Sequence, residues 1–164
     1  MSEIIIVKGG IRTSIGNDVV FGRFDISLFA RGCYFLCPHC HSKQCQSIVG
    51  PSEVICADDV ISKFGEDALS QSSVVGVGGD FIMQQQNWVD FCEDLKKKVP
   101  KLKIVWFTGE EHTKNRNPFF DCFDAIVWGR SVIDDKIQKH ITMMGTQHSI
   151  VEKSYEIVIE KEKY

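Results

Sequence analysis

Three cysteines within eight residues constrain this chain more than any other feature, because a loop that gathers three thiols is suited above all to hold a metal. The loop contains Cys33, Cys37 and Cys40. It follows Phe24–Ala30, a run that alternates apolar and polar residues as a strand does. The pattern predicts a metal site or an iron–sulfur site at the end of a strand.

The number of thiols in the loop bears on its chemistry. A four-iron cluster is normally held by four protein ligands, so a loop with three leaves one iron open to a substrate or cofactor. Two alternatives remain open. A zinc site would take Cys45, His39 or His41 as its fourth ligand, and a ferredoxin-like electron carrier would take Cys45.

The other cysteines do not form a second cluster. The chain has seven cysteines, an odd number, and Cys56, Cys92 and Cys122 are isolated. Cys92 falls on the apolar face of a predicted helix, so we interpret it as a small core residue. Cys56 and Cys122 have no predicted role. In a reducing compartment these thiols would stay free of disulfides.

Composition and charge are those of an ordinary globular protein. The chain is 43% hydrophobic and 25% charged with a net charge of -3, and its 164 residues predict a single domain over 1–164. It has no basic face or tail of the kind that binds nucleic acid. It also has no run of about 18 apolar residues and no signal-peptide layout at Met1–Lys8. We therefore expect a cytoplasmic protein that binds neither nucleic acid nor membranes.

Strand-like and helix-like runs alternate along the chain, which predicts an α/β fold with a mainly parallel sheet. The other expected strands are Glu3–Lys8, Ser73–Val77, Leu102–Phe107, Ala125–Trp128 and, at an edge, Tyr155–Glu160. The expected helices are one capped by Asp58 or Asp59 with Val60, Ile61, Phe64 and Ala68 on one face, and Gln84–Val99 with Trp88, Cys92, Leu95 and Val99 on one face. Because an eight-unit barrel needs more residues, we expect a partial, open barrel of about five to six units.

Each central strand runs into a glycine-containing or polar turn. The turns are Arg31-Gly32, Gly78-Gly79-Asp80, Thr108-Gly109 and Gly129-Arg130. In parallel α/β folds ligands bind at the carboxyl ends of the strands. We therefore expect these turns to converge on one rim.

The cysteine loop and the second turn together resemble a known superfamily. Cys33-x3-Cys37-x2-Cys40 has the spacing of the cluster motif of the radical S-adenosylmethionine superfamily. Gly78-Gly79-Asp80 resembles the Gly-Gly-Glu motif that binds the amino group of S-adenosylmethionine there, with aspartate for glutamate and Phe81 for the usual proline. Two glycines allow the backbone to approach a ligand closely. A carboxylate or a carbonyl oxygen can accept a hydrogen bond from an ammonium group.

Within the superfamily the chain is most similar to the activating protein of the anaerobic ribonucleotide reductase. The short length fits, and so do the segments Phe107-Thr108-Gly109, Phe123–Gly129 and Gly145–Ser149. The chain departs from this family at Trp128, which replaces an acid. It departs again at Ser14–Asp18, where the family has a Gly-Pro-Gly turn.

The resemblance implies two cofactors, a [4Fe-4S] cluster on the three loop cysteines and S-adenosylmethionine on the open iron. Reductive cleavage of S-adenosylmethionine would give methionine and a 5′-deoxyadenosyl radical, with the hard chemistry done by the cofactors. In activating proteins this radical removes a hydrogen from a glycine of the large reductase subunit. The implied partners are that subunit and an external one-electron donor such as flavodoxin.

The resemblance also implies roles for individual residues. Gly78, Gly79 and Asp80 would hold the methionine amino group, His39 would lie near the adenine, Thr108 would hydrogen-bond the cofactor, Arg130 would bind the methionine carboxylate, and Tyr34, Phe35 and Leu36 would shield the cluster. Ordinary alternatives remain for three of these: an exposed loop histidine, a helix cap and a solvated charge. Trp106 and Trp128 are interpreted as core residues.

Two further functions remain open from the sequence. One is a radical enzyme that acts on a small molecule, similar to a 7-carboxy-7-deazaguanine synthase, a class with short members and an ending like Pro38-His39-Cys40. The other is a non-catalytic metal-binding module.

Overall fold

The computed structural model describes residues 2–14, 21–33, 43–109, 122–128, 138–143, 146–153 and 156–162, with Ser14, Trp128 and the last three ranges described by their backbone. The strands are β1 (Glu3–Ser14), β2 (Phe24–Ala30), β3 (Ser52–Cys56), β4 (Ser72–Gly78), β5 (Lys103–Thr108), β6 (Ala125–Trp128), β7 (Gln138–Met143), β8 (Thr146–Lys153) and β9 (Glu156–Glu162). The helices are α1 (Ala57–Phe64), α2 (Glu66–Ser70), α3 (Gln85–Lys98) and the short 3-10 helices η1 (Lys43–Cys45) and η2 (Phe81–Gln84).

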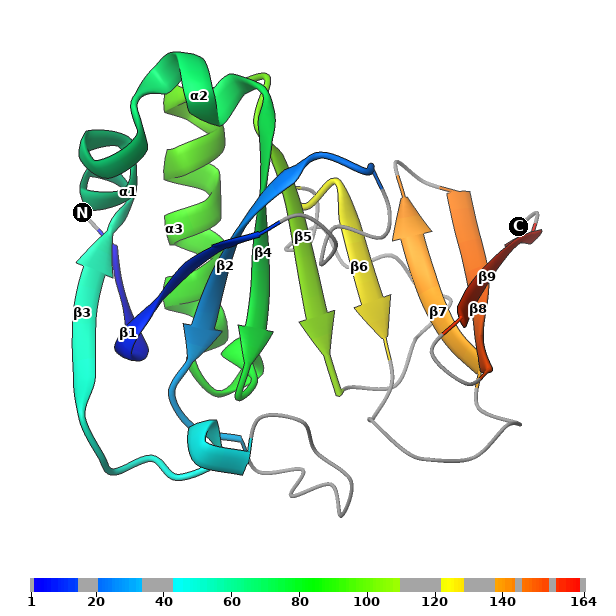
Figure 1. Cartoon of the computed structure of the whole chain (residues 1–164), viewed down its shortest axis with the longest axis horizontal. Coiled ribbons are helices and arrows are strands. Elements are labelled where there is room, and N and C mark those ends of the chain that lie inside the picture. The colour runs from blue at the N-terminus through cyan, green and yellow to red at the C-terminus, as the bar shows by residue number, and fades with distance from the viewer. Residues whose placement is uncertain are drawn as a thin grey trace.

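The strands form one sheet in the order β3-β1-β2-β4-β5-β6-β7-β8-β9. The central strands β2, β4, β5 and β6 are parallel to one another, and antiparallel strands extend the sheet on both sides. The predicted α/β class is confirmed. The sheet is open (Figure 1), and no closed barrel is formed by the described strands. Five to six βα units are not seen there, because antiparallel pairing rather than helical crossovers builds the flanks of the sheet.

The central strands lie where the sequence predicts them. β2 and β6 have the predicted bounds, while β4 and β5 differ from prediction by one residue at each end. β9 is an edge strand, as expected. The strands β3, β7 and β8 were not predicted, because their short runs mix polar with apolar residues and carry no clean alternation.

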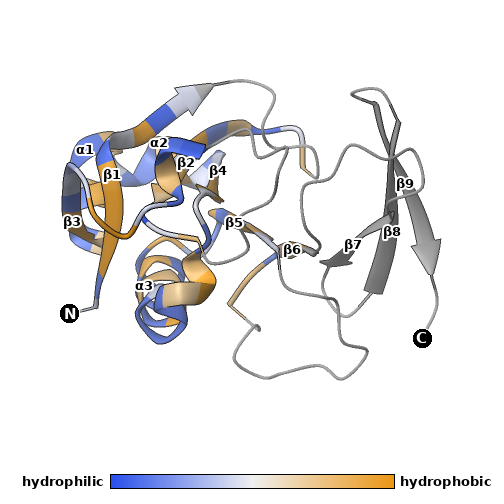
Figure 2. Ribbon diagram, turned by 90° about the horizontal axis from the view of Figure 1, so that it is seen from below, coloured by the Kyte–Doolittle hydropathy of each residue, from blue (hydrophilic) through white to orange (hydrophobic). Residues whose placement is uncertain are grey.

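α3 packs on one face of the sheet (Figure 2) and builds the main core with it. Trp88, Cys92 and Leu95 are buried at helical spacing, as predicted. Trp88 stacks on Phe81 with ring centroids 3.9 Å apart and meets Trp106 of β5 edge-on at 6.5 Å. Cys92 and Trp106 are fully buried, which confirms that they are core residues.

α1 begins before the residues predicted to cap it. Cys56 is the N-cap, and Oδ2 of Asp59 accepts a hydrogen bond from its backbone N–H at 2.8 Å. That bond lowers the pKa of the Asp59 carboxyl. Gly65, with φ 84°, ends α1 and divides the expected single helix into α1 and α2.

Both faces of the central strands are covered. On the face opposite α3, Val75, Val105, Ala125 and Val127 form a second apolar cluster. Strands buried on both faces are typical of parallel sheets. Among the helices that the structure describes, none is both long and apolar enough to cross a membrane.

Candidate metal centre

The carboxyl ends of β2, β4 and β5 meet at one edge of the sheet, as the sequence predicts. The register pairs Ala30 with Gly78 and Thr108 with Trp128. In Figure 1 the arrows of the four parallel strands point the same way, and η1 lies beyond the end of β2. Gly129 and Arg130, which follow β6, lie outside the described residues.

The cysteine loop starts at this edge and is closed at its base. Cys33 is half-buried, directly after β2. The backbone N–H of Gly32 donates to the carbonyl of Cys45 at 2.6 Å, and that of Cys33 donates to the carbonyl of Gln46 at 3.0 Å. The two ends of the loop are therefore joined side by side. Cys37, Cys40, His39 and the segment Tyr34–Leu36 lie outside the described residues, so their assigned roles stay predictions.

Arg31 fastens the return of the loop, a role that sequence reasoning missed. Its guanidinium donates to the carbonyls of Gln44 at 2.9 Å and Pro51 at 2.7 Å, and to the Ser52 hydroxyl at 3.2 Å. A planar fork of donors suits several carbonyl acceptors at once. The only sequence feature that could have indicated this role is the position of Arg31, two residues before the first cysteine of the loop.

The Gly78-Gly79-Asp80 turn is pressed against the start of the cysteine loop. The N–H of Gly79 donates to the carbonyl of Ala30 at 3.0 Å, and the N–H of Asp80 donates to the carbonyl of Gly32 at 2.8 Å. A Cβ on Gly79 would come within 2.8 Å of the Ala30 carbonyl oxygen. Gly78 has φ 90°. The glycines therefore allow the approach of two strand ends, whereas the sequence suggested the approach of a ligand.

The Asp80 side chain is engaged by the protein itself. Its Oδ1 accepts from the N–H of Ile82 at 3.0 Å, and its Oδ2 accepts from the Thr108 hydroxyl at 2.9 Å and the Gly109 N–H at 2.7 Å. Asp80 is only 2% exposed and Thr108 only 3%. The Thr108 hydroxyl therefore has a hydrogen-bond partner within the protein, and the two roles considered for it, cofactor contact and helix cap, stay predictions.

The donor set fits an iron–sulfur cluster. Thiolates are the usual ligands of such clusters, and the first of the three predicted thiols lies where ligands bind in parallel α/β folds. Among the described residues, no three Cys, His, Asp or Glu side chains are grouped to hold a metal ion, because two of the loop cysteines fall outside them.

The remaining thiols differ in position. Cys45 is 1% exposed and lies at the base of the loop beside Gly32. Cys92 is in the main core, where burial raises the pKa of its thiol well above the usual value. Cys122 packs against the same core. Cys56 caps α1.

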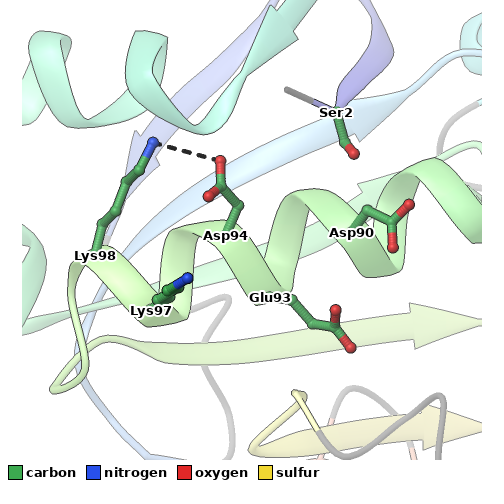
Figure 3. Close-up of a pocket in the computed structure, with 6 residues that line it drawn as sticks. All are labelled: Ser2, Asp90, Glu93, Asp94, Lys97 and Lys98. Carbon is green, nitrogen blue, oxygen red and sulfur yellow. Dashed lines mark hydrogen bonds and ion pairs between the residues drawn. The ribbon is translucent and has the colours of Figure 1, made fainter.

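A shallow pocket on α3 holds none of the predicted site residues. It is lined by Ser2, Asp90, Glu93, Asp94, Lys97 and Lys98 (Figure 3). Lys98 pairs with Asp58 at 2.6 Å and with Asp94 at 3.4 Å. These charges partner one another across the surface between α1 and α3.

Comparison with known families is consistent with the donor set. A family model described as a 4Fe-4S single cluster domain matches residues 21–151, which include the cysteine loop and the four parallel strands. A comparison with curated proteins gave no match.

Proposed function

Because the chain belongs to the family of 4Fe-4S single cluster domains and therefore binds a [4Fe-4S] cluster, we propose that it is a radical S-adenosylmethionine enzyme. Cys33, Cys37 and Cys40 would ligate three irons and leave the fourth to S-adenosylmethionine. When bound, the reduced cluster would supply one electron that cleaves the cofactor into methionine and a 5′-deoxyadenosyl radical.

One observation supports this proposal over a simple cluster carrier. The turn that resembles the cofactor-binding motif is hydrogen-bonded to Gly32, the residue before the first cysteine. The contact supports a ligand that spans the cluster and the turn, as the amino acid part of S-adenosylmethionine would.

The residues of the rim would orient the cofactor. The N–H groups of Gly79 and Asp80 are taken by β2 and by Gly32, and the carbonyl of Asp80 accepts from the N–H of Met83 at 3.2 Å. The carbonyl oxygens of Gly78 and Gly79 would therefore be the acceptors for the cofactor's ammonium. Arg130 would bind the carboxylate and His39 would lie near the adenine. Tyr34, Phe35 and Leu36 would exclude water from the cluster.

We further propose that the radical acts on another protein, the large subunit of the anaerobic ribonucleoside-triphosphate reductase, with an external electron donor such as flavodoxin. The support is the sequence resemblance together with the open sheet. A sheet that does not close leaves a side from which a protein loop can approach the rim.

The position of Cys45 supports one other candidate, a cluster with four cysteine ligands that only transfers electrons. Cys45 is held beside the start of the loop by the Gly32 hydrogen bond. Such a cluster would have no open iron.

Product formation separates these two functions. The protein is reconstituted anaerobically with iron and sulfide, reduced, and assayed for 5′-deoxyadenosine. Cys45→Ser should keep both the cluster and the product, and Cys37→Ser should lose both. Cys56→Ser is the matched control, because serine also caps a helix well. Loss of the cluster in Cys45→Ser, with no product from the unmodified chain, would instead establish the electron carrier.

A further inference from the structure

The Asp80 carboxylate joins the end of β4 to the end of β5, at the edge of the sheet where the cysteine loop begins. We propose that Asp80 is a positioning residue: its side chain holds Thr108 and Gly109 in place and leaves the cofactor ammonium to the backbone of the turn. This inference rests on the proposed function and gives Asp80 a different role from the one suggested by its sequence motif.

The Asp80 side chain already accepts most of the hydrogen bonds that a carboxylate can accept. A carboxylate has about four acceptor positions. Three are used by Ile82, Thr108 and Gly109, at 3.0, 2.9 and 2.7 Å. With 2% of the residue exposed, the side chain is enclosed at the junction of β4 and β5. Its geometry is that of an internal brace.

The brace is connected to the cysteine loop through the backbone. The same residue whose side chain binds Thr108 and Gly109 donates its N–H to the carbonyl of Gly32 at 2.8 Å. Cys33 follows directly. If the end of β5 moved relative to β4, Asp80 and the hydrogen-bonded Gly32 would therefore move as well, and Gly32 directly precedes the first cluster ligand. In this way Asp80 couples the position of the cluster loop to the strand ends on which the cofactor would lie.

The short side chain also explains the departures from the superfamily motif. The bond from the N–H of Ile82 to Asp80 Oδ1 is an N-cap contact two residues ahead, which aspartate accepts and the longer glutamate does not accept in the same geometry. It starts η2, and η2 seats Phe81 on Trp88 at 3.9 Å. Aspartate at 80 and phenylalanine at 81 thus work as a pair.

Three variants of the reconstituted protein test the proposal. Asp80→Asn keeps the size of the side chain but replaces one accepting oxygen with an NH2 group, which cannot accept the hydrogen bonds that this oxygen accepts. Asp80→Glu keeps the charge but displaces it, and Thr108→Val removes one donor at constant shape. Two quantities are measured: the dissociation constant of S-adenosylmethionine from spectral titration of the cluster, and hydrogen exchange of the peptide containing Gly109 by mass spectrometry.

A positioning role predicts that the two quantities change together. In Asp80→Asn, exchange at Gly109 should rise about tenfold and cofactor binding should weaken about tenfold. Asp80→Glu should not restore either. Thr108→Val should have a smaller effect that disappears in the Asp80→Asn background, because the hydroxyl acts through Asp80.

A direct contact with the ammonium predicts a different pattern. Asp80→Asn would then weaken cofactor binding with unchanged exchange at Gly109, and Asp80→Glu would bind nearly as well as the original chain; either result overturns the proposal. If the unmodified protein does not respond to S-adenosylmethionine, the proposed function fails, and the exchange data still decide whether Asp80 is a brace. Arg23→Lys, at the other end of the strands, is the control for a general loss of stability.

Discussion

Contacts within the chain explain why position 79 requires glycine. Its position is hydrogen-bonded to Ala30, and backbone atoms of β2 and Gly32 occupy the space that a side chain would need. Backbone atoms cannot rotate away as a flexible side chain does. The glycine is therefore required by the packing of two strand ends before any ligand is considered.

Gly79→Ala should destabilise the reconstituted protein by about 2 to 3 kcal/mol, because the new methyl group meets backbone oxygens. Gly9→Ala is the matched control. Gly9 has φ 70°, and apart from its own chain neighbours none of the described residues has an atom within 4 Å of the position that a Cβ would take there. Only backbone strain of about 1 kcal/mol therefore applies. Denaturant unfolding measures both. If both variants lose the same free energy of unfolding, the end of β2 can move aside to make room for the methyl group.

Cys92 should resist alkylation in the folded protein. Burial raises the pKa of its thiol above the usual 9.0, so little of the reactive thiolate forms at a pH of about 8. Because the folded state favours the protonated thiol, Cys92 contributes to the free energy of unfolding at pH values below 9.0. That contribution is lost as the pH rises through the raised pKa of the folded state. Mass spectrometry after iodoacetamide should find Cys92 labelled only in denaturant. Labelling of Cys92 in the native protein would contradict its place in the core.

At the scale of elements, the cysteine loop is held by two devices at its base. Backbone hydrogen bonds join Gly32 and Cys33 to Cys45 and Gln46, and the Arg31 guanidinium binds the chain that follows. Together they restrain the ends of the loop without using any of its thiols. Cluster retention should therefore depend on Arg31.

Arg31→Lys should speed the loss of iron to a chelator about tenfold, because an ammonium cannot reach the same set of carbonyls. Arg23→Lys is the matched control. Arg23 donates to the carbonyls of Ser70, Ser72 and Lys101 at the amino ends of the strands, away from the loop. Absorbance of the cluster is followed over time. If both variants lose iron at the same rate, Arg31 has no special role.

The elements that the sequence predicted are those with strong local signals. Phe24–Ala30 and Ala125–Trp128 alternate or run apolar between clear turns, and α3 carries its core residues at helical spacing. The convergence of the turns followed from parallel pairing. The Arg31 and Asp80 contacts could not be read from the sequence, because each links residues that are distant along the chain or depends on exact side-chain length.

Across the whole molecule, one network of stabilising contacts lies at the end of the strands opposite the candidate site. Before β6, Asp124 binds Lys96 of α3 and accepts from the N–H of Ile104 at 2.8 Å. Lys96 also donates to the carbonyl of Leu102 at 2.5 Å. This network joins α3, β5 and β6 away from the rim. A similar division of stability and function is known in β/α barrels.

Asp124→Asn should lower the free energy of unfolding by about 2 kcal/mol, because a mostly buried carboxylate with a charged partner is lost. The affinity of the folded protein for S-adenosylmethionine should stay within about twofold of the original, a free-energy change of about 0.4 kcal/mol. Denaturant unfolding and cofactor titration check the two parts. A large loss of affinity would mean that the two ends of the sheet are coupled.

The proposed chemistry depends above all on whether this [4Fe-4S] protein binds S-adenosylmethionine at an open iron of its cluster. The most direct test is the electron paramagnetic resonance spectrum of the reduced, reconstituted protein before and after S-adenosylmethionine is added. Binding at the open iron predicts a [4Fe-4S]⁺ signal whose g-values shift with the cofactor and do not shift with adenosine, which lacks the amino acid part that would bind the iron. A signal that is the same with and without S-adenosylmethionine would contradict it.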